Sequence, residues 1–351
     1  MEPPAALVVD GIYFESLETD FARPACVSYV REIQSQARRL LYADREAPPV
    51  SNEFIVGATA VALLAGGLLG ALASRQPARQ RPDAVKRCAQ DIDAGAALLA
   101  ASVLADSALE HFRGNYENRL MYVAPATAAA SMAAAASREA PRALGRAVFA
   151  ASTAIGITGL LFHLYNITKR PGGLSWNNLF YAAPVLAPGA LTLSGILGLA
   201  ARRLERLGGR LRFRRRLGEF GSALSYLISG GILATVAEVG LLHFRGAYHD
   251  PFMYVPVTVP PLAAASLAVA GTNPTEQNLR RSDLLLKLTA ALGPIGTAFH
   301  AFGVQRNMGG WRNWTQNLFQ GPPLPAPPSF TALALAGLGA LRLLQQKARA
   351  R

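Results

Sequence analysis

Cysteine is almost absent from this chain, which has two cysteines, Cys26 and Cys88, in 351 residues. The predicted membrane topology places them on opposite faces of the membrane, and neither has a partner at metal-ligand spacing. A disulfide and a cysteine-based metal site are therefore not expected. Charged residues are also sparse, at 16% of the chain against 51% apolar residues, which is too hydrophobic for an ordinary soluble domain.

Several catalytic and cofactor motifs are missing from the sequence. It has no Cys-x-x-Cys-His for covalent haem attachment, no glycine-rich phosphate loop and no His-Glu-x-x-His. It has no Gly-x-Ser-x-Gly nucleophile elbow either. These absences argue against nucleotide-driven transport and serine hydrolysis.

Long uncharged stretches alternate with short charged ones, which is the pattern of an all-α, polytopic membrane protein in a lipid bilayer. Several of the stretches are rich in alanine and glycine, which suits close helix packing in lipid. We predict nine spanning helices, at 54–73, 92–110, 121–137, 147–166, 185–201, 220–243, 255–271, 284–303 and 328–345.

The net charge of +13 has a topological explanation. Basic residues cluster in alternate loops, around 75–87, 138–146, 202–216, 280–287 and 342–351, and with nine spans all five clusters fall on one side. The positive-inside rule makes that side the cytoplasm, so nucleic acid is not expected as a partner. We predict a multi-pass protein of the bacterial inner membrane with an outer N-terminus and a cytoplasmic C-terminus.

The chain repeats itself. His111-Phe112-Arg113-Gly114-x-Tyr116 returns as His243-Phe244-Arg245-Gly246-x-Tyr248, and the segment from Phe162-His163 through Asn178-Leu179-Phe180 returns as Phe299-His300 through Asn317-Leu318-Phe319. A fixed-period match defines a building unit. Each copy holds four predicted spans, so both copies have the same orientation, and we expect a pseudo-two-fold axis along the membrane normal.

This unit divides the chain into six predicted parts. They are an outer N-terminal segment with a short helix near 24–42 (1–52), a first span with a basic loop (53–91), repeat 1 (92–201), a basic linker (202–219), repeat 2 (220–345) and a cytoplasmic tail (346–351).

Four of the five histidines occupy the repeated positions: His111, His163, His243 and His300. Histidine at the rim of the hydrocarbon layer is costly unless it is paired, so these residues are candidate ligands of haem b or of another redox metal at the outer face. The alternative is that each donates a hydrogen bond that fixes helix packing. His249 has no symmetric counterpart and is interpreted as a loop residue.

Two other residue pairs accompany the histidines. Asp106 and Glu238 lie five residues before His111 and His243, about 7 Å deeper along the helix and on a different face. This position suggests a proton relay or a partner of the imidazoles rather than a ligand. An interhelical hydrogen bond is the alternative role. Arg113 and Arg245 could clamp an anionic group such as a haem propionate, or extend to the lipid headgroups. Gly114 and Gly246 are expected to end their helices in a left-handed cap.

The outer loops complete the candidate site. Tyr116 and Tyr248 lie in the first loop of each copy; Asn178 in copy one and Trp311, Trp314 and Asn317 in copy two lie in the longer second loop. Gly-Gly pairs and proline-rich exits there predict either an ordered cap over the helices or an interfacial aromatic belt.

Three functions are compatible with these features. The first is a redox subunit that holds haem b or another metal at the symmetric histidines and passes electrons between a periplasmic partner and quinone. The second is a transporter or channel in which the repeated polar residues line a solute or proton path. The third is a non-catalytic assembly protein whose outer loops dock a periplasmic partner. The paired histidines at one membrane level, with an acid and an arginine at matched positions, favour the first; the transporter and the assembly protein are the alternatives.

Overall fold

A computed structural model describes residues 84–136, 142–207 and 216–349, which all belong to the compact unit Asn52–Arg351. The predicted helix near 24–42, the predicted span 54–73 and the centre of the basic linker lie outside these residues. Within them the chain is helical and contains no strand, which confirms the all-α prediction for this part of the protein.

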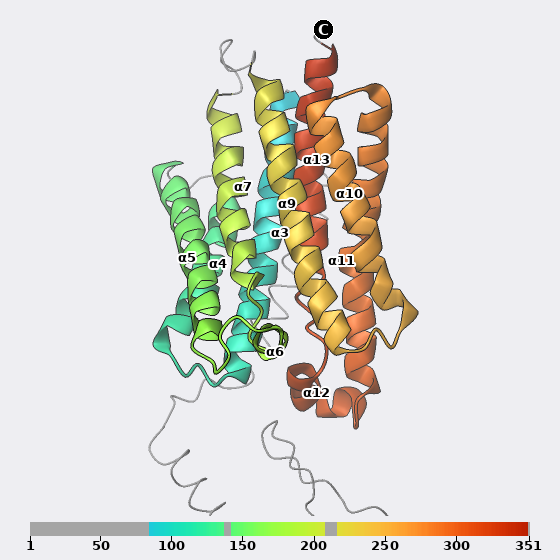
Figure 1. Cartoon of the computed structure of the whole chain (residues 1–351). Helices are drawn as coiled ribbons and strands as arrows, with labels where there is room; N and C mark the ends of the chain where they lie inside the picture. Colours follow the sequence, from blue (N-terminus) through green and yellow to red (C-terminus); the bar gives the residue numbers. More distant parts are fainter. Residues whose placement is uncertain (1–83, 137–141, 208–215, 350–351) are drawn as a thin grey trace, which may run out of the picture. The chain divides into compact units, whose positions relative to one another are not determined.

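The first half of the described chain alternates long and short helices (Figure 1). In chain order they are α3 (Ala84–Arg113), the 3₁₀ turn η1 (Arg119–Tyr122), α4 (Val123–Ala136), α5 (Arg142–Thr168), α6 (Trp176–Tyr181) and α7 (Ala187–Leu207).

The second half contains a 3₁₀ turn and helices in the same order, with one further 3₁₀ turn. They are α9 (Leu217–Arg245), η2 (Pro251–Tyr254), α10 (Val255–Thr272), α11 (Glu276–Arg306), η3 (Gly310–Asn313), α12 (Trp314–Gln320) and α13 (Pro328–Arg349). The short helices α6 and α12 lie at the same end of the long helices, away from the C-terminus (Figure 1).

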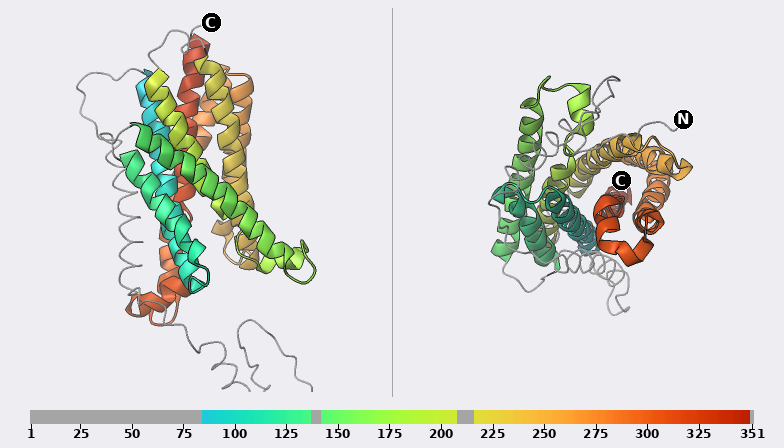
Figure 2. Two further views of the ribbon diagram at one scale, coloured as in Figure 1. Left: turned by 90° about the vertical axis from the view of Figure 1, so that its left-hand side faces the viewer. Right: turned by 90° about the horizontal axis from the view of Figure 1, so that it is seen from below.

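Each half packs its four long helices in a ring. In the first half α3 contacts α4 and α7, and α5 contacts the same two helices, so α3 and α5 stand on a diagonal. The second half has the same neighbours, with α9 and α11 on the diagonal. The halves meet unequally, because α3 packs extensively along α13 whereas α7 and α9 touch over a short stretch (Figure 2).

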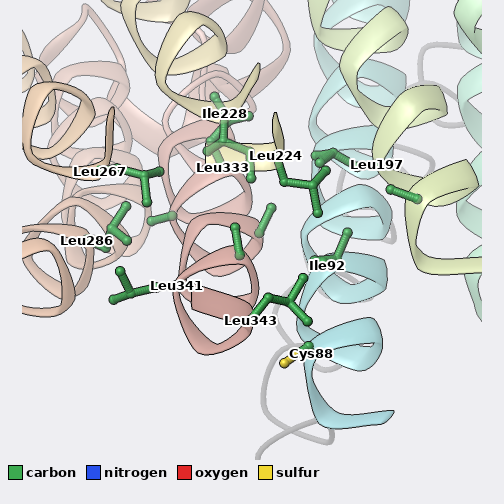
Figure 3. Close-up of a cluster of buried hydrophobic side chains, with 14 of the residues drawn as sticks. Cys88, Ile92, Leu197, Leu224, Ile228, Leu267, Leu286, Leu333, Leu341 and Leu343 are labelled. Carbon is green, nitrogen blue, oxygen red and sulfur yellow. The ribbon is translucent and has the colours of Figure 1, made fainter. Parts of the chain in front are cut away.

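Small residues set the distance between α3 and α13. A Cβ added to Gly95 would lie 2.6 Å from the carbonyl oxygen of Ala332 and 3.0 Å from the Cβ of Ala336. Around this contact, leucine and isoleucine side chains from α3, α7, α9, α10, α11 and α13 form the largest buried cluster (Figure 3). Close backbone approach through small residues is the way in which helices pack in lipid.

The prediction of nine spans is not matched. Among the described residues five helical segments are long and apolar enough to cross a membrane: Val85–Arg113, Ala143–Thr168, Leu217–Arg245, Pro251–Thr272 and Glu276–Arg306. They indicate a bilayer environment. Helices do form at the predicted spans 121–137, 185–201 and 328–345, but α4 has only 14 residues, and arginines in α7 and α13 lower their hydropathy. The predicted topology, which counted nine spans, therefore stays a prediction.

Candidate functional site

The repeated polar residues lie at the end of the helices that carries α6 and α12 (Figure 1). α3 and α9 both end here, at Arg113 and Arg245, and both chains then turn sharply into a 3₁₀ turn. The site is therefore built from two helix ends, the turns that follow them and the two short helices.

Both helix ends have the hydrogen bonds of a Schellman motif. The Tyr116 and Asn115 amides donate to the carbonyls of His111 and Phe112, at 2.9 Å each. The Tyr248 and Ala247 amides make the corresponding bonds in the second half.

The predicted left-handed glycine caps are wrong. Gly246 has a φ of −83°, and its amide still donates to Leu242 within the helix. The left-handed conformation falls instead on the two residues that follow each glycine, with φ values of 53° and 45° at Asn115 and Tyr116 and 54° and 47° at Ala247 and Tyr248. The tertiary position of the tyrosine outweighs the local preference of glycine for positive φ.

This backbone conformation folds each tyrosine back onto its own helix. The Tyr116 hydroxyl donates to the Ala108 carbonyl at 3.2 Å, and the Tyr248 hydroxyl donates to the Gly240 carbonyl at 3.1 Å. Tyr116 stacks on Tyr122 with a centroid distance of 4.0 Å, and Tyr248 stacks on Tyr254 at 4.5 Å. Burial, with a smaller effect of Tyr122, raises the pKa of the Tyr116 phenol above its usual value.

Each of the four repeated histidines is tethered through Nδ1 to a backbone carbonyl. His111 contacts Met121 O at 2.7 Å and His243 contacts Met253 O at 2.8 Å, which closes the first turn of each half. His163 contacts Pro184 O at 2.6 Å and His300 contacts Pro323 O at 2.7 Å, which fastens the second loop. A carbonyl accepts only from a protonated Nδ1, so in the neutral ring Nε2 keeps its lone pair.

The histidines are near each other in pairs and not as a group of four. His111 lies within electrostatic range of His163, and His243 lies within range of His300, in each case across the diagonal of one half. In the part of the chain that the structure describes, no three histidine, cysteine, aspartate or glutamate side chains come together as a possible metal site. The four imidazoles thus do not share one centre there.

The arginines reach across to the opposite half. Arg113 donates through Nη2 to the carbonyls of Gly321, at 3.0 Å, and Leu318, at 3.4 Å, at the C-terminal end of α12. Arg245 donates to the carbonyls of Ala182, at 3.1 Å, and Leu179, at 3.3 Å, at the C-terminal end of α6. Each guanidinium thus binds the carbonyls that a helix end leaves without partners, where a cation is also favoured.

The phenylalanines beside these arginines also contact the opposite half. Phe112 of α3 packs against Phe319 of α12 with a centroid distance of 4.6 Å, and Phe244 of α9 packs edge-on against Phe180 of α6 at 5.8 Å. The two repeated motifs, His-Phe-Arg and Asn-Leu-Phe, therefore meet across the halves. Their joint repetition was the signal that could have predicted this contact.

The acids join the arginines rather than the histidines. Asp106 lies within electrostatic range of Glu110 and Arg113 on its own helix and of Glu238 on α9. Glu238 lies within range of Arg245, and Arg113 forms an ion pair with Glu110. We call these five residues, Asp106, Glu110, Arg113, Glu238 and Arg245, the junction cluster.

Helix geometry explains this grouping, which the sequence analysis missed. Asp106 and Arg113 are seven residues apart, two turns on one helix face, and Glu238 and Arg245 have the same spacing. A comparison of the acids with the arginines rather than with the histidines would have revealed it. Leu242 replaces Glu110 in the second half, so Arg245 lacks the corresponding ion pair.

The predicted loop residues have structural contacts. The Asn178 amide donates to the carbonyls of Pro171 and Gly173, at 2.9 and 2.8 Å, and the Asn317 amide donates to Met308 and Gly310, at 3.1 and 2.8 Å. Both asparagines are buried. They hold turns whose paired glycines all have positive φ, as expected: Gly172, Gly173, Gly309 and Gly310.

The tryptophans of the second loop lie nearer the surface. Trp311 is 47% exposed and its amide donates to the Gln305 side chain at 3.0 Å, whereas Trp314 begins α12 and is partly buried. In the first half Trp176, which is 64% exposed, packs against Phe180 and Phe244. Exposed aromatic rings beside a polar loop suit the membrane–water interface.

The chain was compared with protein-family models, with curated proteins and with solved structures, and none of them matches it.

Proposed function

We propose that this protein is a transporter or channel of the bacterial inner membrane that carries protons or small cations past the junction cluster. In this proposal two tandem four-helix repeats, related by a pseudo-two-fold axis along the membrane normal, form the transmembrane part. The end with α6 and α12 faces the outside. The matched neighbours of the long helices and the reciprocal arginine bonds support the repeat and its symmetry.

The carrying observation is that Asp106 and Glu238, on two different apolar helices, lie within electrostatic range of each other. Ionisable residues inside membrane helices are rare and usually mark ion or proton pathways. Two carboxylates within electrostatic range in a medium of low dielectric repel each other unless one of them binds a proton or a cation lies between them. Such a pair is suited to take up and release a positive charge.

The surrounding arginines leave this pair available. Arg113 is engaged by Glu110 and by two carbonyls of the α12 end, and Arg245 is engaged by two carbonyls of the α6 end. Neither forms an ion pair with Asp106 or Glu238. The cluster has three acids and two arginines, so it favours a cation over an anion.

A flux assay tests the proposal. Protein reconstituted into liposomes with a pH-sensitive dye inside should dissipate an imposed pH or cation gradient faster than empty liposomes. Asp106→Asn and Glu238→Gln should each abolish most of this flux, whereas Glu219→Gln, at an exposed carboxyl of α9, should preserve it. Wild-type flux equal to that of empty liposomes, or flux unaffected by the first two substitutions, would refute the proposal.

The histidine tethers favour a second candidate, a redox subunit that passes electrons between a periplasmic partner and quinone. Donation of Nδ1–H to a carbonyl is the arrangement that orients an imidazole for metal ligation through Nε2. Two such imidazoles from the diagonal helices of each half, His111 with His163 and His243 with His300, are suited to hold haem b axially. Arg113 and Arg245 lie beside them.

Absorbance spectroscopy separates the two candidates. A redox subunit should show a reduced-minus-oxidised Soret band in purified membranes, and this band should disappear in the double variant His111→Ala, His243→Ala. His249→Ala, at the histidine without a counterpart, is the matched control. Protein that is colourless and free of metal would eliminate this candidate and leave the flux proposal unaffected.

A further inference from the structure

The two carboxyl groups of the junction cluster meet different backbone chemistry. Oε2 of Glu238 accepts a hydrogen bond of 2.9 Å from the Leu186 amide, in the loop between α6 and α7 of the other half. The corresponding loop of the second half has Pro325 at this position, as Pro184 and Pro188 match Pro323 and Pro327. Proline has no N–H to donate.

The loop between α12 and α13, which contains Pro325, nevertheless contacts α3. The Ser102 hydroxyl of α3 donates to the Pro325 carbonyl at 2.5 Å, and Ser102 lies one turn before Asp106 on the same helix. This bond places Pro325 about one helical turn from Asp106, whereas Leu186 contacts Glu238 directly. Among the described residues Asp106 has no hydrogen-bond partner, and it is partly buried.

We propose that the halves are unequal, with Asp106 as the carboxyl group that binds and releases the proton and Glu238 as a fixed anion. This inference rests on the proposed proton path and names its exchanging residue. A backbone N–H that donates to a carboxylate stabilises the ionised form, and Glu238 has such a donor in Leu186. Asp106 lacks that donor, and Arg113, the cation on the same face of α3, forms an ion pair with Glu110.

The second carboxylate oxygen of Glu238 supports these different roles of Asp106 and Glu238. Oε1 of Glu238 is buried and has no hydrogen-bond partner among the described residues. It is the free acceptor through which Glu238 can attract the proton toward the junction while Oε2 stays bound to Leu186. A single exchanging group beside a fixed anion avoids the simultaneous charging of both carboxylates.

Dicyclohexylcarbodiimide measures which group is protonated, because it reacts with carboxylic acids in apolar surroundings. The acid O–H adds across a C=N bond to give an O-acylisourea, whose acyl group migrates to nitrogen as a stable N-acylurea without any oxidant or leaving group. In full-length protein in liposomes near neutral pH, mass spectrometry of the peptides should show Asp106 modified about tenfold more than Glu238. This is the factor expected for one hydrogen bond to a charged group. Glu219, exposed to water, should stay unmodified.

Reciprocal substitutions test the cause. Pro325→Ala supplies an amide beside Asp106 and should lower its modification toward that of Glu238, whereas Leu186→Pro removes the donor to Glu238 and should raise its modification. Equal modification of the two groups in the wild type, or faster modification of Glu238, would overturn the inference whether or not the variants fold. Wild-type protein with Asp106 modified but with no proton flux would instead refute the proposed transport.

Discussion

The Arg245 guanidinium of α9 donates a hydrogen bond to the Ala182 carbonyl, 3.1 Å away at the C-terminal end of α6 in the opposite half. Arg113 makes the corresponding bond to Gly321. At this end, therefore, side chains of each half contact the other half, whereas the long helices α7 and α9 touch only over a short stretch.

Loss of one arginine should loosen this connection. We expect Arg245→Gln to lower the free energy of unfolding by about 1–3 kcal/mol, because two carbonyls of the α6 end lose their partner. Limited proteolysis should then cut the 169–186 loop faster. Arg146→Gln, at an exposed arginine of α5, is the control and should change neither measurement. Unchanged proteolysis in Arg245→Gln would show that this contact does not hold α6 in place.

The buried loop asparagines should be structurally essential. Asn317→Ala leaves the Met308 and Gly310 carbonyls without the amide that they bind, and we expect it to reduce stability by about 1–3 kcal/mol. Asn178→Ala should behave alike. Asn166→Ala, at an exposed position of α5, should have little effect on the thermal midpoint in detergent. Equal midpoints for all three variants would contradict the role assigned to the loop amides.

The left-handed residue after α9 predicts a stabilising substitution. Ala247 has a φ of 54°, a conformation that a Cβ disfavours by about 1–2 kcal/mol. Ala247→Gly should therefore raise the free energy of unfolding by about 1 kcal/mol. Ala237→Gly, at an exposed position inside α9, should instead lower it by about 0.5–1 kcal/mol. A destabilised Ala247→Gly variant would mean that Ala247 does not keep this conformation in the protein.

The buried Tyr116 phenol predicts a loss of stability at alkaline pH. Its pKa is higher in the folded chain than its ordinary value of 10.0, because burial opposes the phenolate. The contribution is fully present below pH 10 and is lost as the pH rises through the folded pKa. A Tyr116→Phe variant should lose less stability than the wild type over this range, although loss of the bond to Ala108 lowers its stability at pH 8. Parallel alkaline profiles would contradict the prediction.

Much of the fold was predictable, because apolar periodicity and repetition are local properties of the sequence. Helices form at each of the eight predicted spans that the structure describes, and the Gly-Gly pairs have the positive φ expected of them. The predicted count of spanning helices is not matched among the described residues, because α4 is short and because α7 and α13 carry arginines.

The residues of the candidate site were predicted from the sequence, but their arrangement in space was not. The roles expected of His111, His163, His243 and His300 as ligands, and of Asp106 and Glu238 as a relay, stay predictions. The cross-half contacts of Arg113 and Arg245 were not foreseen, since a guanidinium at a membrane rim is equally suited to lipid headgroups or to an anionic ligand. In the structure each guanidinium instead binds carbonyls at the end of a short helix of the other half, α12 for Arg113 and α6 for Arg245.

The sequence by itself determined that this chain is helical and apolar, and which residues its two copies share. Those features follow from hydropathy and from identity along one chain. Only the tertiary structure decided that the arginine and phenylalanine of each half contact the other half, and that Leu186 donates to Glu238 while Asp106 has no such donor. The physical reason is that a hydrogen bond or a ring contact needs two groups a few ångströms apart. Residues more than 50 positions apart in the chain reach that separation only when the helices pack.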